Sequence, residues 1–257
     1  MSAPRRVTWR TLWAVIWRSL FLQTCWNFQG MQNVGFSFAL VPLARALYPE
    51  PERRQALLAR HLEFFNTHPY CASIILGVVC RLEEENDPEA ARRIKGSMMG
   101  PLAALGDTVF WAMLKPSLAL LAVCWIWAAG SGHPGLALLG PVLYLLLFNL
   151  AHLSLRAGGV LVGYARGLEI VKDLRRFNPQ LIARRLGWMA SVLLGATALL
   201  AWSQGAPAWE LSYPAMAGLG LGATALAYML LAIGLSATQL FYLLTGSAVL
   251  LAVLGWI

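Results

Sequence analysis

The sequence predicts an all-α integral membrane protein, in which re-entrant, broken and amphipathic N-terminal helices precede about five transmembrane helices. Two observations predict this class. First, 58% of the 257 residues are hydrophobic, only 12% are charged, and the mean hydropathy is +0.60, a composition typical of membrane proteins. Second, the charged residues are confined to a few segments, so that Glu210 is the only one after Arg185. We therefore expect a single membrane domain over residues 1–257.

The C-terminal part of this domain, residues 98–257, contains the predicted transmembrane helices. A helix needs about 20 apolar residues to cross the hydrocarbon core of a bilayer. The chain offers such stretches at 101–130, 136–155, 187–203, 214–233 and 239–257.

The distribution of basic residues predicts the topology. Basic side chains gather at 5–18, 45–60, 81–95 and 156–185, and cytoplasmic segments of membrane proteins are enriched in Lys and Arg. We expect a cytoplasmic N-terminus, a cytoplasmic basic segment at 156–186 and a multi-pass protein. The net charge of +8 is thus explained by topology, and nucleic acid is not an expected partner.

The N-terminal part, residues 1–97, is predicted to enter the membrane without simply crossing it. The apolar stretch 20–44 has basic segments on both sides and contains several amides, which a lipid-facing helix does not tolerate without partners. We expect a re-entrant hairpin or broken helix there. The stretch 69–80 is too short to cross, which predicts a second re-entrant or interfacial element.

Polar residues concentrate in RHLEFFNTHPY, residues 60–70. An amphipathic helix is predicted from Pro51 to Phe65, with Glu63 and Asn66 on the same side of its last turn. Pro69 should disrupt helical geometry at the preceding residue, and Asn66, Thr67 or His68 is expected to cap a new helix. A metal site of His61, Glu63 and His68 is a weaker alternative, because H-x-E-x4-H lacks the H-E-x-x-H spacing. We expect no metal and no cofactor.

Two further constellations lie in the transmembrane part. Asp107 is a carboxylate in a long apolar run, with Trp111 one helical turn beyond it. A carboxylate beside an aromatic ring suits the hydroxyls and the apolar face of a sugar, although Asp107 could merely cap a broken helix or neutralise Lys115. In the second constellation Asn149, His152 and Arg156 share a helix face.

Structural roles are the simpler interpretation for several other residues. Arg156 and Arg166 are predicted to be interfacial anchors, while Gly158, Gly159 and Gly163 would allow close helix packing. The run RLEEENDPEAARRIKG, residues 81–96, is typical of a solvated cytoplasmic segment. The four cysteines have no metal or redox spacing and are expected to be ordinary thiols.

Four motifs together resemble the IID membrane component of mannose-type (mannose/fructose/sorbose) sugar phosphotransferase systems. They are WNFQGMQNVGFSFALVPLARALYP at 26–49, RHLEFFNTHP at 60–69, IKGSMMGPLAALGDTVFW at 94–111 and NLAHLSLRAGGVLVGYARG at 149–167. The resemblance implies a permease subunit of the bacterial inner membrane. It would work in a hetero-oligomer with a IIC subunit and translocate a hexose or amino sugar. Cytoplasmic IIA and IIB proteins would phosphorylate that sugar.

The resemblance also implies site residues. The family pattern N-Y-E-R-M-Q is replaced here by residues 27–32, NFQGMQ, so that an acidic and a basic position have become Gln29 and Gly30. The positions that still match predict the substrate-binding and supporting groups. The predicted substrate-binding residues are Gln32, Asn33, Asn66, Asp107 and Trp111, and the predicted supporting residues are Asn27, Glu63, His68 and Asn149.

No phosphoryl-carrying residue is expected in this chain, because such a histidine must be reachable by a soluble donor. The protein is therefore predicted to be a transport subunit and not an enzyme. The departures at Gln29 and Gly30 keep one alternative open, in which an orphan or regulatory IID subunit senses sugar or phosphorylation state and transports little.

Overall fold

The computed structural model describes residues 6–129, 133–176 and 178–205, and scattered residues between 218 and 250. The chain divides into two compact units, residues 1–204 and 205–257. In the second unit the described residues include short helical stretches at 228–230 and 245–247. The last two predicted spans, 214–233 and 239–257, lie largely outside the described residues.

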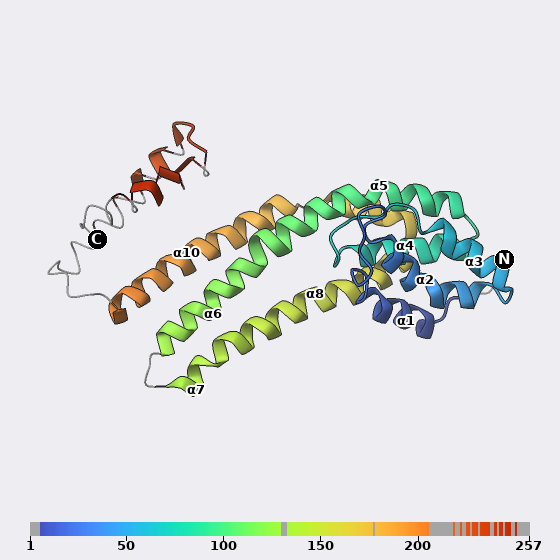
Figure 1. Ribbon diagram of the computed structural model, residues 1–257, viewed down its shortest axis with the longest axis horizontal. Coiled ribbons are helices and arrows are strands. Elements are labelled where there is room, and N and C mark those ends of the chain that lie inside the picture. The colour runs from blue at the N-terminus through green and yellow to red at the C-terminus, as the bar shows by residue number, and fades with distance from the viewer. Residues whose placement is uncertain are drawn as a thin grey trace. The chain divides into compact units, whose positions relative to one another are not determined.

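The secondary-structure elements described in the first unit are all helices, which confirms the predicted all-α class. Among the described residues of this unit, β-type pairing is limited to isolated bridges that join Met31 to Asn27 and to Phe65. The elements of Figure 1 are α1 (Trp9–Ser19), α2 (Asn33–Leu47), α3 (Pro51–Arg60), α4 (Ala72–Glu84), α5 (Pro88–Gly106), η1 (Asp107–Leu114), α6 (Lys115–Ala129), α7 (Pro134–Ala137), α8 (Leu139–Arg166), η2 (Gly167–Glu169), α9 (Ile170–Arg176) and α10 (Pro179–Gly205).

The core of the first unit surrounds α4, in which every residue from Ala72 to Cys80 is buried. Glycines let α8 approach it closely. A Cβ at Gly163 would lie 2.4 Å from the carbonyl oxygen of Ile74, and a Cβ at Gly77 would lie 2.2 Å from that of Val160. The predicted packing role therefore holds for Gly163 and for Gly159, where a Cβ would lie 2.2 Å from the Ser73 hydroxyl, but it is wrong for Gly158, where a Cβ would meet nothing within 4 Å. The short apolar stretch 69–80 supplies most of this central helix.

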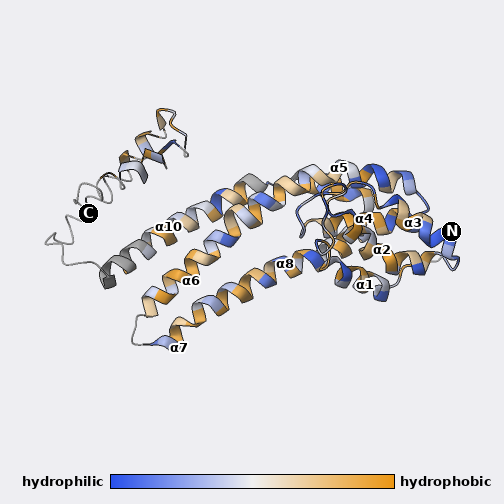
Figure 2. Ribbon diagram, in the orientation of Figure 1, coloured by the Kyte–Doolittle hydropathy of each residue, from blue (hydrophilic) through white to orange (hydrophobic). Residues whose placement is uncertain are grey.

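Two helical runs are long and apolar enough to cross a membrane, Pro88–Ala129 and Pro134–Leu174. They include the first two predicted spans, 101–130 and 136–155. In Figure 2 the ribbons of α6 and α8 are coloured mostly as hydrophobic residues where they extend away from the N-terminal helices. Large apolar side chains such as Val142 and Leu146 are more than half exposed there, as expected of helices that contact lipid or another membrane subunit.

The first of these runs changes its helical geometry at η1. Residues Asp107–Leu114 form a π-helix between two α-helical segments. Pro116 follows directly in α6 and cannot donate the backbone hydrogen bond of its position, and local widening of a helix accommodates such a missing bond. π-Helical turns occur often at functional sites, and this one begins at the predicted substrate-binding residue Asp107.

Candidate functional site

The polar stretch 60–70 forms a loop between α3 and α4. α3 ends at Arg60, so the predicted helix as far as Phe65 is wrong at its C-terminal end. The backbone of Phe65 pairs with the turn before α2 instead: its amide donates to the carbonyl of Gly30 at 3.2 Å, and its carbonyl accepts from the amide of Gln32 at 2.8 Å. This long-range pairing competes with the continuation of the helix. Consequently Glu63 and Asn66 do not share a helix face.

The start of α4 also differs from the prediction. Residues 69–71 form a turn, and the helix begins at Ala72 with no side-chain cap from Cys71. The carbonyl of His68 accepts the Ala72 amide at 3.0 Å. A turn at residues 69–71 therefore leads into α4, and of the expected capping residues His68 contributes, because its Nδ1 accepts from the Tyr70 backbone N–H at 3.4 Å.

The Gln32 side chain holds this loop in place. Its amide nitrogen donates to the carbonyl of Thr67 at 2.8 Å, and its amide oxygen accepts from the Thr67 backbone N–H at 3.2 Å. Gln32 is buried, and the Thr67 hydroxyl donates in turn to the carbonyl of Met99 in α5 at 2.9 Å. A buried amide needs such partners. Gln32 thus joins the turn before α2 to the FNTHP motif.

Asn27 and Asn33 form a second link in the same turn. The Asn27 amide donates to the Asn33 side-chain oxygen at 3.2 Å, and the Asn33 amide donates to the carbonyl of Leu62 at 2.5 Å. The Asn33 side chain also occupies the space beside Gly30, where a Cβ would lie 2.1 Å from its nitrogen. Both asparagines are partly exposed. Asn66 is exposed on the neighbouring loop, and its backbone N–H approaches the sulfur of Met99 at 3.4 Å.

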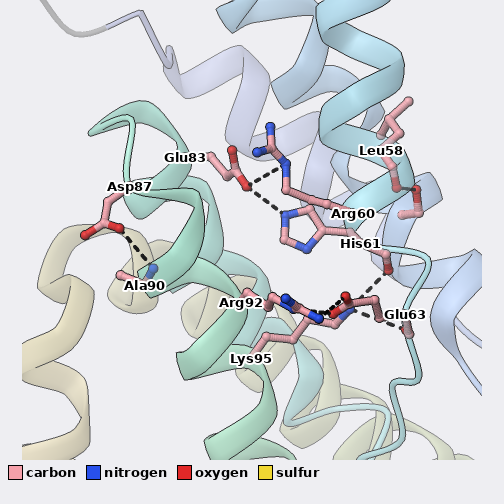
Figure 3. A network of polar contacts seen from close by, with 10 residues as sticks. Leu58, Arg60, His61, Glu63, Glu83, Asp87, Ala90, Arg92 and Lys95 are labelled. Atoms are coloured by element: carbon pink, nitrogen blue, oxygen red, sulfur yellow. Dashed lines mark hydrogen bonds and ion pairs between the residues drawn. The ribbon is translucent and has the colours of Figure 1, made fainter.

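Lys95 of α5 fixes the other side of the loop, although sequence reasoning did not single it out (Figure 3). Its ammonium donates to the carbonyls of His61 at 3.1 Å and Glu63 at 3.5 Å. The ammonium also lies 5.1 Å from the ring centre of Phe36, close enough for a cation–π contact. The side chain is almost fully buried. The available sequence signal was its spacing in α5, in the buried stripe Ala91, Lys95, Met98, Leu102.

Glu83 corrects the prediction that residues 81–96 are a solvated segment. Its carboxylate is 1% exposed and accepts from Nε2 of His61 at 2.9 Å, with the Arg60 guanidinium at 3.6 Å (Figure 3). Burial lowers the pKa of His61, although the bond to Glu83 acts in the opposite direction. Glu83 is buried because it lies on the same inward stripe as the preceding α4 residues, whereas Glu85 is exposed.

Glu63 points away from this interior. It is exposed and pairs with Arg92 of α5 at 2.7 Å. The supporting contact of the Glu63 side chain is thus its ion pair with Arg92, which holds the loop against α5.

Asp107 and Trp111 lie in η1, and both side chains are exposed. Within the described residues the Asp107 carboxylate forms no hydrogen bond or ion pair, and Lys115 does not neutralise it. Trp111 is 47% exposed, and its ring centre lies 4.9 Å from that of His68. The loop thus reaches η1 through its histidine.

His68 itself is enclosed by aromatic rings. It stacks on Phe110 at 5.5 Å, and the absence of a side chain at Gly106 makes room for its ring, because a Cβ there would lie 2.2 Å away. Burial lowers the pKa of His68 to about 4, so the imidazole is neutral at physiological pH. His68 therefore positions Trp111 through packing.

Tyr70 joins this aromatic group to α8. Its ring stacks on His152 at 4.7 Å, and the His152 ring bonds to the Asn149 side chain at 3.0 Å. Arg156 lies 5.1 Å over the Tyr70 ring and donates to the carbonyl of Ser19 at 2.5 Å. The fold thus brings the constellations at 107–111 and 149–156 to the same loop.

The position of Arg156 corrects its predicted role as an interfacial anchor. Its side chain is buried and binds the last residue of α1. The negative end of a helix dipole stabilises a cation at this place. Arg166, by contrast, is exposed and pairs with Asp173 at 3.4 Å.

The three residues of the alternative metal site each contact a different part of the protein. His61 bonds to Glu83, His68 packs among aromatic rings, and Glu63 pairs with Arg92. In the part of the chain that the structure describes, no three His, Cys, Asp or Glu side chains are grouped as a metal would require.

Comparison with known proteins accounts for this combination of a polar loop and apolar helices. Residues 6–201 match the family model described as "PTS system mannose/fructose/sorbose family IID component". The chain belongs to this IID family. The mannose-specific EIID component of Escherichia coli (strain K12) is 44% identical over 180 residues, 67% of this chain and 61% of the relative. The chain thus spans about three fifths of the length of that relative.

Other relatives of the IID chain differ in the sugar that their names give. The fructose permease IID component of Bacillus subtilis (strain 168) is 33% identical over 76% of this chain and 71% of its own length. A solved structure described as a complex of the mannose transporter ManYZ and microcin E492 contains a chain with 32% identity and a TM-score of 0.58. The match covers 98% of the IID chain and 97% of that chain.

Proposed function

We propose that this IID chain is a permease subunit that, with a IIC subunit, binds a hexose or amino sugar and moves it across the bacterial inner membrane. The family supports this role, and the structural neighbour is a mannose transporter. Cytoplasmic IIA and IIB proteins would supply the phosphoryl group. The complex would be a hetero-oligomer in the bilayer, with the N-terminus of the IID chain in the cytoplasm.

The observation that carries the proposal is the exposed carboxylate of Asp107, which lies in an apolar helical run without a partner among the described residues. An ionisable group in a membrane helix is energetically costly and marks a functional site by default. Beside it the half-exposed ring of Trp111 offers an apolar face. Such a pair accepts hydrogen bonds from sugar hydroxyls and covers the C–H face of the ring.

Asn66 and Asn33 complete the proposed site from the other elements. Asn66 is exposed on the loop that packs against Trp111 through His68, and the Asn33 amide is partly exposed beside that loop. Gln32 was also predicted to bind substrate; in the proposal its direct contact with sugar requires that it exchange its bonds to Thr67. Asn27, Glu63, His68 and Asn149 support the site through neighbouring residues.

The chemistry proposed for this chain is binding and release without a covalent intermediate. His61 and His68 are both buried, and one bonds to Glu83 while the other packs on Phe110. These contacts support the proposal that neither ring receives a phosphoryl group from a soluble donor. Recovery of a stable phosphohistidine on the IID chain in the presence of active donors would contradict this part of the proposal.

The experiment is uptake and phosphorylation of labelled hexoses and amino sugars by vesicles that contain the IID chain, its IIC partner and the phosphoryl donors. We expect donor-dependent uptake of at least one sugar, and we expect Asn66→Ala to reduce it while the complex still assembles. If the assembled wild-type complex takes up no sugar of the panel, the regulatory alternative replaces the transport proposal. That alternative predicts sugar-dependent binding to IIC or IIB with little flux.

A further inference from the structure

α1 exposes an aromatic stripe that the proposed transport function does not use. Trp9, Trp13 and Trp17 follow one another at intervals of four residues and are 58%, 47% and 64% exposed. Residues four apart lie on one face of an α-helix. The ring centres of Trp9 and Trp13 are 5.8 Å apart, so these rings form a continuous surface.

The face of α1 next to this stripe packs against the protein core. Its buried residues are Leu12, Val15, Ile16 and Ser19. At about 100° per residue, the buried residues, the tryptophans and the arginines follow one another around the helix. Arg10 and Arg18 lie beyond the stripe on the side away from the core. The stripe therefore separates a buried apolar face from a basic face.

The aromatic surface continues from α1 onto α2. The ring of Phe21, just after α1, lies 6.1 Å from Trp17 and 6.5 Å from Phe38 of α2. Both phenylalanines are more than 40% exposed. The Arg18 guanidinium lies 4.5 Å from the Phe38 ring centre. A helix of 11 residues is about half the length needed to span a bilayer. The aromatic surface of α1 can therefore be covered only if the helix lies along a membrane surface or against another protein.

The composition of the stripe fits a lipid interface. Tryptophan is enriched at the headgroup level of membranes, because its ring is apolar and its N–H is polar. Arginine beside it pairs with lipid phosphates, and α1 contains no acidic residue that would oppose an anionic surface.

We propose that α1 lies in the headgroup region of the bilayer, with Trp9, Trp13 and Trp17 directed into the lipid and Arg10 and Arg18 contacting anionic phosphates. The occupant of this surface is thus phospholipid. The proposal concerns how α1 contacts the membrane, and it holds whether or not the chain transports sugar.

The test uses nitroxide labels on single cysteines in the full IID chain assembled with its IIC partner. The background carries Cys25→Ser and Cys124→Ala, since these two native thiols are at least partly exposed. A label is attached at Trp13→Cys, and the matched control is Ala14→Cys, the next residue, which lies toward the arginine face. Power saturation compares collisions with oxygen, which concentrates in lipid, and with a water-soluble nickel chelate.

In vesicles of phosphatidylethanolamine and phosphatidylglycerol, we expect oxygen to dominate at position 13 and nickel to dominate at position 14, with a several-fold difference in the ratio. Equal nickel access at both positions would overturn the proposal, because the stripe would then face water. Protection of position 13 from both reagents that appears only with IIC present would also overturn it and assign the surface to the partner subunit. Native-like assembly of each labelled variant is checked by size-exclusion chromatography.

Discussion

The polar groups around the FNTHP loop (residues 65–69) and the Asp107 carboxylate of η1 differ in how far the chain itself satisfies them. Around the loop, Gln32, Glu83 and Lys95 are buried, and each bonds to groups of another element. In η1 the Asp107 carboxylate is exposed and bonds to no described group. The comparison teaches that the buried polar residues hold the loop in place, whereas the proposed sugar contact falls on a carboxylate that the described chain leaves unbonded.

α5 connects the two regions mechanically. Lys95 and Met99 hold the loop through its carbonyls and the Thr67 hydroxyl, and the same helix continues into η1 at Asp107. α5 therefore fixes the position of Asp107 relative to Asn66. Variants around the loop and variants in η1 can therefore distinguish effects on stability from effects on sugar binding.

The largest effect is expected at Glu83. Glu83→Ala leaves the buried His61 ring without its hydrogen-bond acceptor; the unpaired donor costs about 1–3 kcal/mol, and the cavity left by the shortened side chain raises the total to about 3–5 kcal/mol. We expect the free energy of unfolding in detergent to fall by that amount, together with loss of assembled complex. Glu85→Ala is the matched control, since Glu85 is exposed and pairs with Arg81; it should cost no more than about 1 kcal/mol. Equal losses of unfolding free energy in the two variants would show that Glu83 has no special structural role.

Lys95→Met should have the next largest effect. Methionine keeps an unbranched apolar stem but cannot donate to the carbonyls of His61 and Glu63, and hydrogen bonds from charged groups contribute about 1.5–3 kcal/mol. We expect a loss of stability in that range and a higher KM for sugar uptake, because the loop that carries Asn66 loses a constraint. Lys95→Arg should restore part of both quantities. A stability loss with unchanged KM would show that Lys95 has no influence on the site.

Asp107→Asn is expected to affect uptake and leave stability unchanged. The carboxylate has no partner in the described chain, and exposed substitutions of this kind change stability by about 0.5 kcal/mol or less. Loss of a charged hydrogen bond to a sugar hydroxyl, about 1.5–3 kcal/mol, should reduce kcat/KM for uptake by about 10- to 100-fold. Lys115→Gln, at another exposed charge of the same run, is the control. Normal uptake by Asp107→Asn would place the sugar elsewhere.

The smallest effect is expected at Arg92. Its ion pair with Glu63 is exposed on both sides, and such pairs contribute about 0–1 kcal/mol. Arg92→Gln should lower the unfolding midpoint only slightly, and salt should weaken the difference between variant and wild type. A loss as large as that of Lys95→Met would mean that the exposed contact holds the loop as strongly as the buried one.

Much of the architecture was predictable from local pattern. The hydropathy predicted the apolar helices at 101–130 and 136–155, and the motif order predicted the IID family. The end of α3 was not predictable, because residues 61–65 favour continuation of the helix until Phe65 pairs with the turn at Gly30. Glu83 and Arg156 were assigned to solvent or interface, since their burial depends on His61 and Ser19, which are distant in the sequence.

The sequence by itself determined the helical class, the family and the residue types of the candidate site, because hydropathy and motif spacing are properties of the chain alone. Only the tertiary structure decided which polar residues are already bonded and which are open to a ligand. The physical reason is that a buried amide, carboxylate or ammonium is stable only with partners. For Gln32, Glu83 and Lys95 these partners come from segments that folding brings together.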